Sequence, residues 1–447
     1  MIPYLRTVGR VILSACLTAT LLLHGCGGGA TGPTLKIMSP HWEGIRIEFE
    51  RAWNAARAAA GLPPVKVEWL DVGGTSDIVK YIRSTFARTP EGIDIDLFFG
   101  GGVDPYIAFA DEGLLAPVNV PEGILSNIPP DLHGVPLYDQ EGRWYGAALS
   151  GFGILYNNVL LEKFSLPVPA GWEDLTKPAL RSWVGSADPR KSGSTHMMYE
   201  IIVQAYGWDL GMEIIAKLAG NVKGFTQSAS TVPKDIATGN IAAGLCIDTY
   251  AWSAIEDAGE EHLGFTMPQG LTVVNPDAIA MLKGAPQPEL AREFIEFVLS
   301  EAGQKIWMLK IGSVEGAPTE YQLNKMPIWP ALFKKYRDHV VFKESPFDWS
   351  SSVHYDTDKG SARWGIFNDY LGTMFIDQHP LCAKAWAKVC ELPDDNPLRA
   401  LYMDMPMSEN EMLAAATNAY TDSRWRADKL ASWANNARRR YSKILEN

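Results

Sequence analysis

The chain has few cysteines, and their spacing excludes several kinds of site. Five occur among 447 residues, with no Cys-x-x-Cys pair and no zinc-like spacing. Cys16 and Cys26 lie near the N-terminus, which leaves Cys246, Cys382 and Cys390 in the body of the chain. The last two are eight residues apart in a helical pattern. That spacing is roughly 12 Å along one straight helix, too far for a disulfide. We expect no metal site.

Basic charge and catalytic motifs are also scarce. The net charge is −12, and it becomes −14 once the two arginines of the N-terminal signal described below are removed. Such an acidic balance argues against nucleic acid as a partner. The sequence has no G-x-S-x-G and no H-E-x-x-H motif, so it does not support a serine hydrolase or a zinc protease of those kinds. Neither glycine turn of the body, at 73–74 or 100–102, matches a P-loop or the G-x-G-x-x-G pattern, so nucleotide binding is not supported. We expect no cofactor.

The N-terminus has the pattern of an export signal. Arg6 and Arg10 precede an apolar stretch that is far shorter than the ~20 residues of a membrane span. A small residue, Cys26 and a run of glycines follow in the order of a bacterial lipoprotein signal. We predict that 1–25 are removed, that Cys26 carries lipid and that 26–33 form a flexible tether. The alternative is an ordinary cleaved signal with a cysteine by chance.

Strand and helix patterns alternate after the tether. Apolar patterns predict strands over 34–38, 65–69 and 93–99, and helical spacing predicts helices over 42–60, 77–86 and 106–113. This alternation is typical of an open α/β sheet, whose ligands lie at the carboxyl ends of strands. Those ends carry Ser39 and His41 and two glycine turns, at 73–74 and 100–102.

Two long extended segments divide the chain further. Residues 145–158 and 264–279 are extended in pattern and lack a helical period. Between them the strand and helix patterns recur, at 183–187, 195–206, 212–220, 233–238 and 241–247. An amphipathic helix is predicted over 289–309, and the chain reads as helical from 363 onward, with a capping box at Ser408 and Glu411.

Several motifs then occur together. The segments are DIDLFFGGG (94–102), ALSGFGILYNN (148–158), WEDLTKPALRSWVGSADPRKSGSTHMM (172–198), GNIAAGLCIDTYA (239–251) and VVNPDAIAMLKGAPQPELAREFIEFVLSEAGQKIW (273–307). In these segments the chain resembles the extracytoplasmic solute-binding proteins of bacterial ABC transporters. The branch is the one that contains binders of iron(III), thiamine, phosphosugars and aminoethylphosphonate. The likeness runs from about 34 to 310.

The resemblance implies a two-lobed periplasmic-binding-protein fold of the α/β class, in which two crossing hinge strands join lobes that close on a ligand. We predict that 34–148 and 271–345 form a first lobe, that 149–270 form a second lobe, and that 346–447 add a helical C-terminal segment. These three names are used for these ranges from here on.

The first candidate site is the turn at 188–195, between a strand and a helix. Ser192, Ser194 or Thr195 can cap the helix, whose free N–H groups and positive end then suit a phosphate or carboxylate beside Lys191. The alternative is a plain helix cap with a solvated lysine. The family resemblance favours binding.

Further candidates lie on other strand ends. By the resemblance, the loop with Ser39 and His41 contacts ligand, and Ser150 lies near a ligand-contacting strand. Gly74 and Gly101 belong to turns in which backbone N–H groups approach a ligand closely. For each turn the alternative is a tight turn alone, and His41 has the alternative of a surface residue.

The last candidates are Asp248 and Tyr250. Iron(III) binders of the resembling family usually show neighbouring tyrosines near this point, whereas this chain has Asp-Thr-Tyr, which puts iron coordination in doubt. Asp248 then pairs with an ammonium or thiazolium-type cation against Tyr250. The alternative is a strand-end cap.

The sequence therefore predicts a lipid-anchored, periplasmic receptor, not an enzyme. We expect a monomer that captures a small polar solute, in our reading an anionic one, by lobe closure and delivers it to ABC permease subunits. Iron(III) or thiamine binding is the alternative within this class. An extracytoplasmic hydrolase is the alternative outside it.

Overall fold

The computed structural model describes residues 32–342, 344–349 and 353–447. The export signal and Cys26 lie outside the described residues, so lipid attachment stays a prediction. Within the described ranges, no helix is both long enough and apolar enough to cross a bilayer. Cys246, Cys382 and Cys390 are free thiols. Cys382 and Cys390 lie on one helix, as their spacing predicts.

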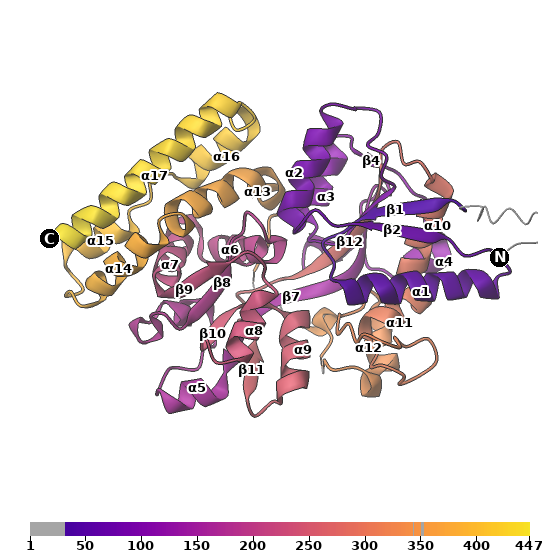
Figure 1. Ribbon diagram of the computed structural model, residues 1–447, viewed down its shortest axis with the longest axis horizontal. Coiled ribbons are helices and arrows are strands. Elements are labelled where there is room, and N and C mark those ends of the chain that lie inside the picture. Colours follow the sequence, from indigo (N-terminus) through magenta and orange to yellow (C-terminus); the bar gives the residue numbers. More distant parts are fainter. Residues whose placement is uncertain (1–31, 343, 350–352) are drawn as a thin grey trace, which may run out of the picture. The chain divides into compact units, whose positions relative to one another are not determined.

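One mixed sheet runs through both lobes (Figure 1). Its main strands are β1 (Thr34–Met38), β2 (Lys66–Leu70), β3 (Leu97–Phe99), β7 (Tyr145–Asn157), β8 (Val184–Ala187), β9 (Val222–Thr226), β10 (Ala243–Ile247) and β12 (Val274–Leu282). Their order across the sheet is β2-β1-β3-β12-β7-β10-β8-β9. The strands at each end of this order are parallel, and those at its centre are antiparallel.

The central strand β7 links the lobes. Its residues 145–151 pair with β12, and its residues 152–156 pair with β10 of the second lobe. β12 in turn pairs with β3 of the first lobe. Nearly all of the 13 residues of β7 are buried, which explains why the sequence there is apolar rather than alternating.

Helices cover both faces of each half of the sheet. In the first lobe, α1 (Glu43–Ala59), α10 (Pro288–Leu299) and α11 (Glu301–Met308) cover one face, and α2 (Thr75–Phe86) and α3 (Asp104–Asp111) cover the other. Successive side chains of a strand point to opposite faces of the sheet. Leu97 and Phe99 of β3 therefore pack against the first group of helices, and Phe98 packs against the second.

The second lobe repeats this plan. Its faces are covered by α6 (Gly193–Tyr206) and α7 (Trp208–Asn221) on one side, and by α8 (Thr231–Ala237) and α9 (Asp248–Ala258) on the other. On β7, Ile154 belongs to the cluster on the α6 side and Leu155 to the cluster on the α9 side.

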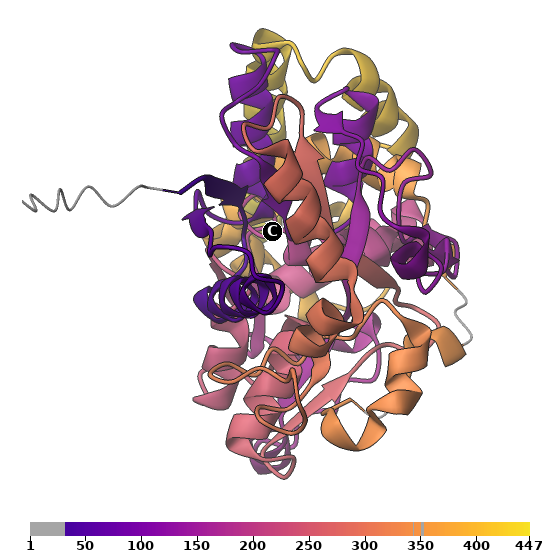
Figure 2. The ribbon, with the colours of Figure 1, turned by 90° about the vertical axis from the view of Figure 1, so that its right-hand side faces the viewer.

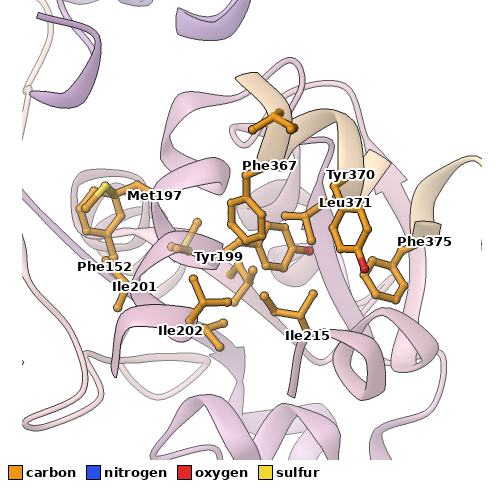
Figure 3. Close-up of a cluster of buried hydrophobic side chains, with 14 of the residues drawn as sticks. Phe152, Met197, Tyr199, Ile201, Ile202, Ile215, Phe367, Tyr370, Leu371 and Phe375 are labelled. Atoms are coloured by element: carbon orange, nitrogen blue, oxygen red, sulfur yellow. The ribbon is translucent and has the colours of Figure 1, made fainter. Parts of the chain in front are cut away.

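The C-terminal segment forms a further helical layer. It contains α13 (Thr357–Leu371), a π-helical turn (Gly372–Ile376), α14 (His379–Cys390), α15 (Pro397–Met403), α16 (Glu409–Asn418) and α17 (Ser423–Glu446). These helices lie beside α6 and α7 and also reach α3 of the first lobe (Figure 1, Figure 2). Phe367 and Leu371 of α13 share a buried cluster with Ile202 and Ile215 (Figure 3).

Most predicted elements form, with several differences. The helix predicted over 289–309 is broken at Ser300, whose extended backbone ends α10 and whose side chain caps α11. The extended segment over 264–279 is two strands, because β11 (Leu263–Thr266) ends before β12 begins and pairs back with β7. The strand predicted over 93–99 is only three residues long, and β9 was not predicted.

The smaller elements are β4 (Leu115–Ala116), β5 (Asp131–Leu132), β6 (Val135–Pro136), α4 (Glu122–Leu125), α5 (Asn158–Lys163) and α12 (Pro330–Lys335). The capping box at Ser408 and Glu411 forms as predicted and starts α16.

Candidate functional site

A cavity of about 470 Å³ lies between the lobes. Its lining comes from strand ends and helix starts of both lobes and from Lys325. Eight of the ten predicted ligand-binding residues line it: His41, Gly74, Gly101, Ser150, Lys191, Ser192, Ser194 and Tyr250. The other two, Ser39 and Asp248, are fully buried next to lining residues and do not line it themselves.

The glycine turns let the two lobes meet closely. A Cβ atom on Gly74 would lie 1.9 Å from the carbonyl oxygen of Lys191, in the other lobe. Cβ atoms on Gly101 and Gly193 would both collide with the side chain of Thr75. Three chain segments from two lobes therefore converge at this point, and only glycine fits there.

Two helices begin at this meeting point. α2 starts at Thr75 with no side-chain cap, and Ser192 caps α6 by accepting a hydrogen bond from the Thr195 N–H at 3.2 Å. The first N–H groups of a helix have no partner within it, and the helix dipole adds partial positive charge there. Two such ends from opposite lobes give the cavity a wall suited to an anion.

Polar contacts join the lobes along the edge of the cavity. Ser76 donates a hydrogen bond to the Pro189 carbonyl at 3.0 Å, and Lys80 donates one to the Arg190 carbonyl at 3.2 Å. Lys191 forms an ion pair with Asp77 at 3.1 Å. These contacts hold the two lobes against each other beside the cavity.

The C-terminal segment reaches the same turn from behind. Arg190 donates hydrogen bonds to both carboxylate oxygens of Asp377, at 2.8 and 3.0 Å, and also pairs with Asp188. This fixes the turn that carries Lys191 and Ser192.

A group of buried polar side chains forms another part of the lining. Asp277 of β12 contacts both His41 and Lys325, with 3.0 Å between His41 Nε2 and Asp277 Oδ2. Lys325 also donates to Ser150 Oγ at 2.8 Å. Burial would raise the pKa of Asp277, but Lys325 and His41 outweigh it and hold that pKa below its usual range. Burial lowers the pKa of His41, which keeps the imidazole neutral.

Sequence reasoning missed Asp277, Lys325 and Asn275 as site residues. Asn275 also lines the cavity, and its Oδ1 accepts a hydrogen bond from the Val103 N–H at 3.0 Å. Asp277 and Asn275 lie within the predicted crossing strand, so their position beside the cavity follows from that strand. Nothing local in the sequence pointed to Lys325.

Asp248 has a different setting from the one that we expected. It begins α9 rather than ending a strand, and its carboxylate accepts hydrogen bonds from the backbone N–H groups of Gly151 (2.7 Å) and Thr249 (2.6 Å). Burial raises its pKa to about 7. These backbone hydrogen bonds correspond to the alternative in which Asp248 is a cap. The bond from Gly151 also joins the hinge strand β7 to α9 of the second lobe. Ser39 likewise accepts a hydrogen bond from the His41 N–H at 3.1 Å.

Apolar side chains complete the lining. Phe152 and Met197 lie at the same end of the large hydrophobic cluster (Figure 3) and also line the cavity. Trp42 is 40% exposed at its mouth and packs on Tyr321. In the part of the chain that the structure describes, no group of three or more His, Cys, Asp or Glu side chains could hold a metal ion.

Comparison with known proteins identifies the family. A sequence model described as bacterial extracellular solute-binding protein matches residues 95–336, more than half of the chain. The phosphoglycerate transport regulatory protein PgtC of Salmonella typhimurium is 34% identical over 159 residues. That match covers 36% of this chain and 39% of PgtC, so the chain spans about two fifths of this relative's length.

Solved structures share the fold. The periplasmic binding protein AfuA of Actinobacillus pleuropneumoniae is 19% identical, with a TM-score of 0.59 that covers 80% of this chain and 99% of AfuA. The periplasmic binding protein P5PA is 21% identical, with a TM-score of 0.62 that covers 77% and 99% of the two chains. The predicted two-lobed α/β fold with an added helical C-terminal segment is confirmed.

Proposed function

Because the chain belongs to the family of bacterial extracellular solute-binding proteins, we propose that it is the receptor of an ABC importer for a small organic anion. The lobes close on the solute, and the closed form docks on permease subunits. The receptor does no chemistry on its solute. In this proposal the export signal places it in the periplasm, and lipid on Cys26 holds it at a membrane as a monomer.

The convergence of two helix starts from opposite lobes carries this proposal. The starts of α2 and α6 meet at the cavity, with Thr75 against Gly193 and Gly74 against Lys191. An anion between them receives N–H groups from both helices at once. It thereby stabilises the closed form more than the open form, which is the condition for ligand-driven closure.

The names of related proteins support an organic anion as the solute. AfuA was solved with exogenous fructose-6-phosphate, and PgtC is named for phosphoglycerate transport. Iron is bound by another relative, HitA of Pseudomonas aeruginosa. The lining of this cavity offers Tyr250 as its one tyrosine, and the described residues contain no metal-holding cluster. Both observations favour a phosphate or carboxylate over iron(III).

A thermal-shift screen followed by calorimetry tests the proposal. The compounds are glycerol phosphates, phosphoglycerates, hexose phosphates, phosphonates, dicarboxylates, thiamine phosphates and ferric chelates. A hundredfold excess over Kd stabilises the folded protein by about 2.7 kcal/mol, a clear shift. We expect one class of organic anion to bind and to be recovered unchanged. Binding of ferric chelates alone, or turnover of a compound, would contradict the proposal.

Two serine caps give a matched pair of variants. Ser192 caps α6 at the cavity, and Ser300 caps α11 away from it. Loss of either cap costs about 0.5–2 kcal/mol of stability. We expect Ser192→Ala to weaken anion binding about tenfold. Without the cap the first turn of α6 is less well ordered, and the anion also loses the Ser192 hydroxyl as a possible hydrogen-bond donor. Ser300→Ala should leave affinity unchanged.

A further inference from the structure

Asp277 is an unexpected residue in a cavity for an anion. It lines the cavity, is 6% exposed and remains ionised, since its two cationic or donor neighbours hold its pKa low. A carboxylate repels a bound anion unless it faces another part of the ligand. The ion pair with Lys325 removes most of that repulsion, because Lys325 is itself only 4% exposed and lines the same cavity.

Both polar contacts of the Asp277 carboxylate are made by one of its oxygens. Oδ2 accepts hydrogen bonds from His41 Nε2 and from Lys325 Nζ. Oδ1 is buried, and no donor among the described residues reaches it. A buried acceptor without a donor costs about 1–3 kcal/mol, so a donor on a bound solute would stabilise Oδ1.

His41 supplies a second acceptor of the same kind. A neutral imidazole beside a carboxylate donates from the nitrogen that touches it, here Nε2, which assigns the other nitrogen as an acceptor. That nitrogen, Nδ1, is buried and also has no partner among the described residues. Two buried acceptors therefore stand without donors in one part of the cavity lining.

We propose that Asp277, positioned by Lys325 and His41, is the specificity-determining residue of this receptor and selects anions that carry a hydroxyl or ammonium donor. The inference rests on the proposed function, since it assumes that the anionic group occupies the starts of α2 and α6. The donor-bearing part of the solute then meets Asp277 Oδ1. An anion without such a donor leaves that oxygen unpaired in the closed form and binds more weakly.

Matched ligand pairs test this on the wild-type protein. The pairs are glycerol 3-phosphate with propyl phosphate, and glycerate with propionate, each measured by calorimetry. We expect the hydroxylated member to bind at least about tenfold more tightly, as for a site built to satisfy a buried polar group. Equal affinities within a pair would overturn the inference and leave anion binding intact. If no member of either pair binds and the screen finds no other organic anion, the proposed anion receptor itself fails. If another anion binds, that anion and its analogue without the hydroxyl or ammonium group form the deciding pair.

A variant locates the selectivity. Asp277→Asn keeps the shape of the side chain and leaves Lys325 uncompensated, so affinity for every anion shifts. The informative quantity is the ratio of affinities within a pair, which we expect to fall to about threefold or less. Ser192→Ala should weaken both members equally and keep the ratio. A ratio unchanged in Asp277→Asn would contradict the assignment, as would a ligand complex in which Oδ1 contacts only water. If Asp277→Asn does not fold, the wild-type ratio still decides.

Discussion

The two places where the lobes are held together differ in kind. At the edge of the cavity, α2 and the turn at 188–192 meet through hydrogen bonds to carbonyl groups and one ion pair, and the side chain of Lys191 is 44% exposed. Of these contacts, the Ser76 hydrogen bond is buried, whereas the two lysine contacts are exposed. Water can replace the exposed contacts when the lobes separate, so they add little to stability.

Apart from the exposed pair of Asp377 with Arg190, the C-terminal segment meets both lobes through buried groups. Arg363 of α13 pairs with Glu200 of α6, and both side chains are 0% exposed. Tyr355 donates to Asp104 Oδ2 of the first lobe at 2.5 Å, also in a buried position. The surrounding cluster contains apolar side chains from α2, α3, α6, α7 and α13. Water cannot replace these contacts without exposing apolar surface and buried charge. The contacts that contribute most to stability therefore lie beside the C-terminal segment, whereas the contacts at the edge of the cavity are more readily broken and formed again.

The largest effect is expected from Arg363→Met. Methionine fills much of the space but leaves the Glu200 carboxylate buried without its partner. Removal of one member of a buried ion pair costs about 3–5 kcal/mol. Chemical unfolding followed by tryptophan fluorescence measures the loss.

Lys359→Met is the control for that change. Lys359 contacts Glu409, the more exposed partner of Arg363, at 3.4 Å. We expect a loss within about 1 kcal/mol, as for other surface pairs. Equal losses in the two variants would remove the distinction between the buried and the exposed contacts.

A pH-dependent effect is expected from Asp104→Asn. Burial raises the pKa of Asp104 to about 8, although the Tyr355 hydroxyl opposes this. The unfolded carboxyl has a pKa near ~3.9, so between about pH 4 and pH 8 the unfolded chain loses a proton that the folded chain keeps. The stability contributed by Asp104 is thus complete below that range and is lost as the pH rises to about 8.

The asparagine variant has no such proton to lose. Relative to the wild type, we expect it to gain about 3–4 kcal/mol of stability between pH 5 and pH 8. Unfolding curves at both pH values measure the gain. Asp111→Asn, on the exposed end of the same helix, is the control for loss of a carboxylate at the surface. A constant difference between Asp104→Asn and the wild type across this range would show that Asp104 is ionised in the folded protein.

The smallest effect on stability is expected from Lys80→Met. It removes one exposed hydrogen bond between the lobes, so the free energy of unfolding should change by less than about 0.5 kcal/mol. Solute affinity should still fall two- to threefold. The reason is that a weak contact made only in the closed form raises the population of that form, and the variant loses this contact. A large loss of stability would show that the Lys80 contact supports the fold, as the buried contacts of the C-terminal segment do.

The hydrophobic pattern predicted most of this architecture. β1 forms over the predicted residues because a short apolar run ends at a proline turn, and β7 is extended because glycine and apolar residues follow one another without a helical period. The break at Ser300 could not be seen, because the apolar period continues on both sides of it. Only the backbone of that one residue departs from the helix.

The candidate site was predictable where local chemistry marked it. Glycine turns and the serine cap lie at strand ends that the α/β pattern already assigns to ligands. Asp277 was different, because a charge inside a strand resembles a solvent-facing residue. Its partners Lys325 and His41 are 48 and 236 residues away, and only the fold brings them together.

The decisive measurement is a crystal structure with the bound organic anion. We expect the anionic group to accept hydrogen bonds from backbone N–H groups at the starts of both α2 and α6. We also expect a hydroxyl or ammonium group of the same solute to contact Asp277 Oδ1. An anionic group bound to one lobe alone, or a metal ion held in its place, would show that the receptor does not recognise its solute in this way.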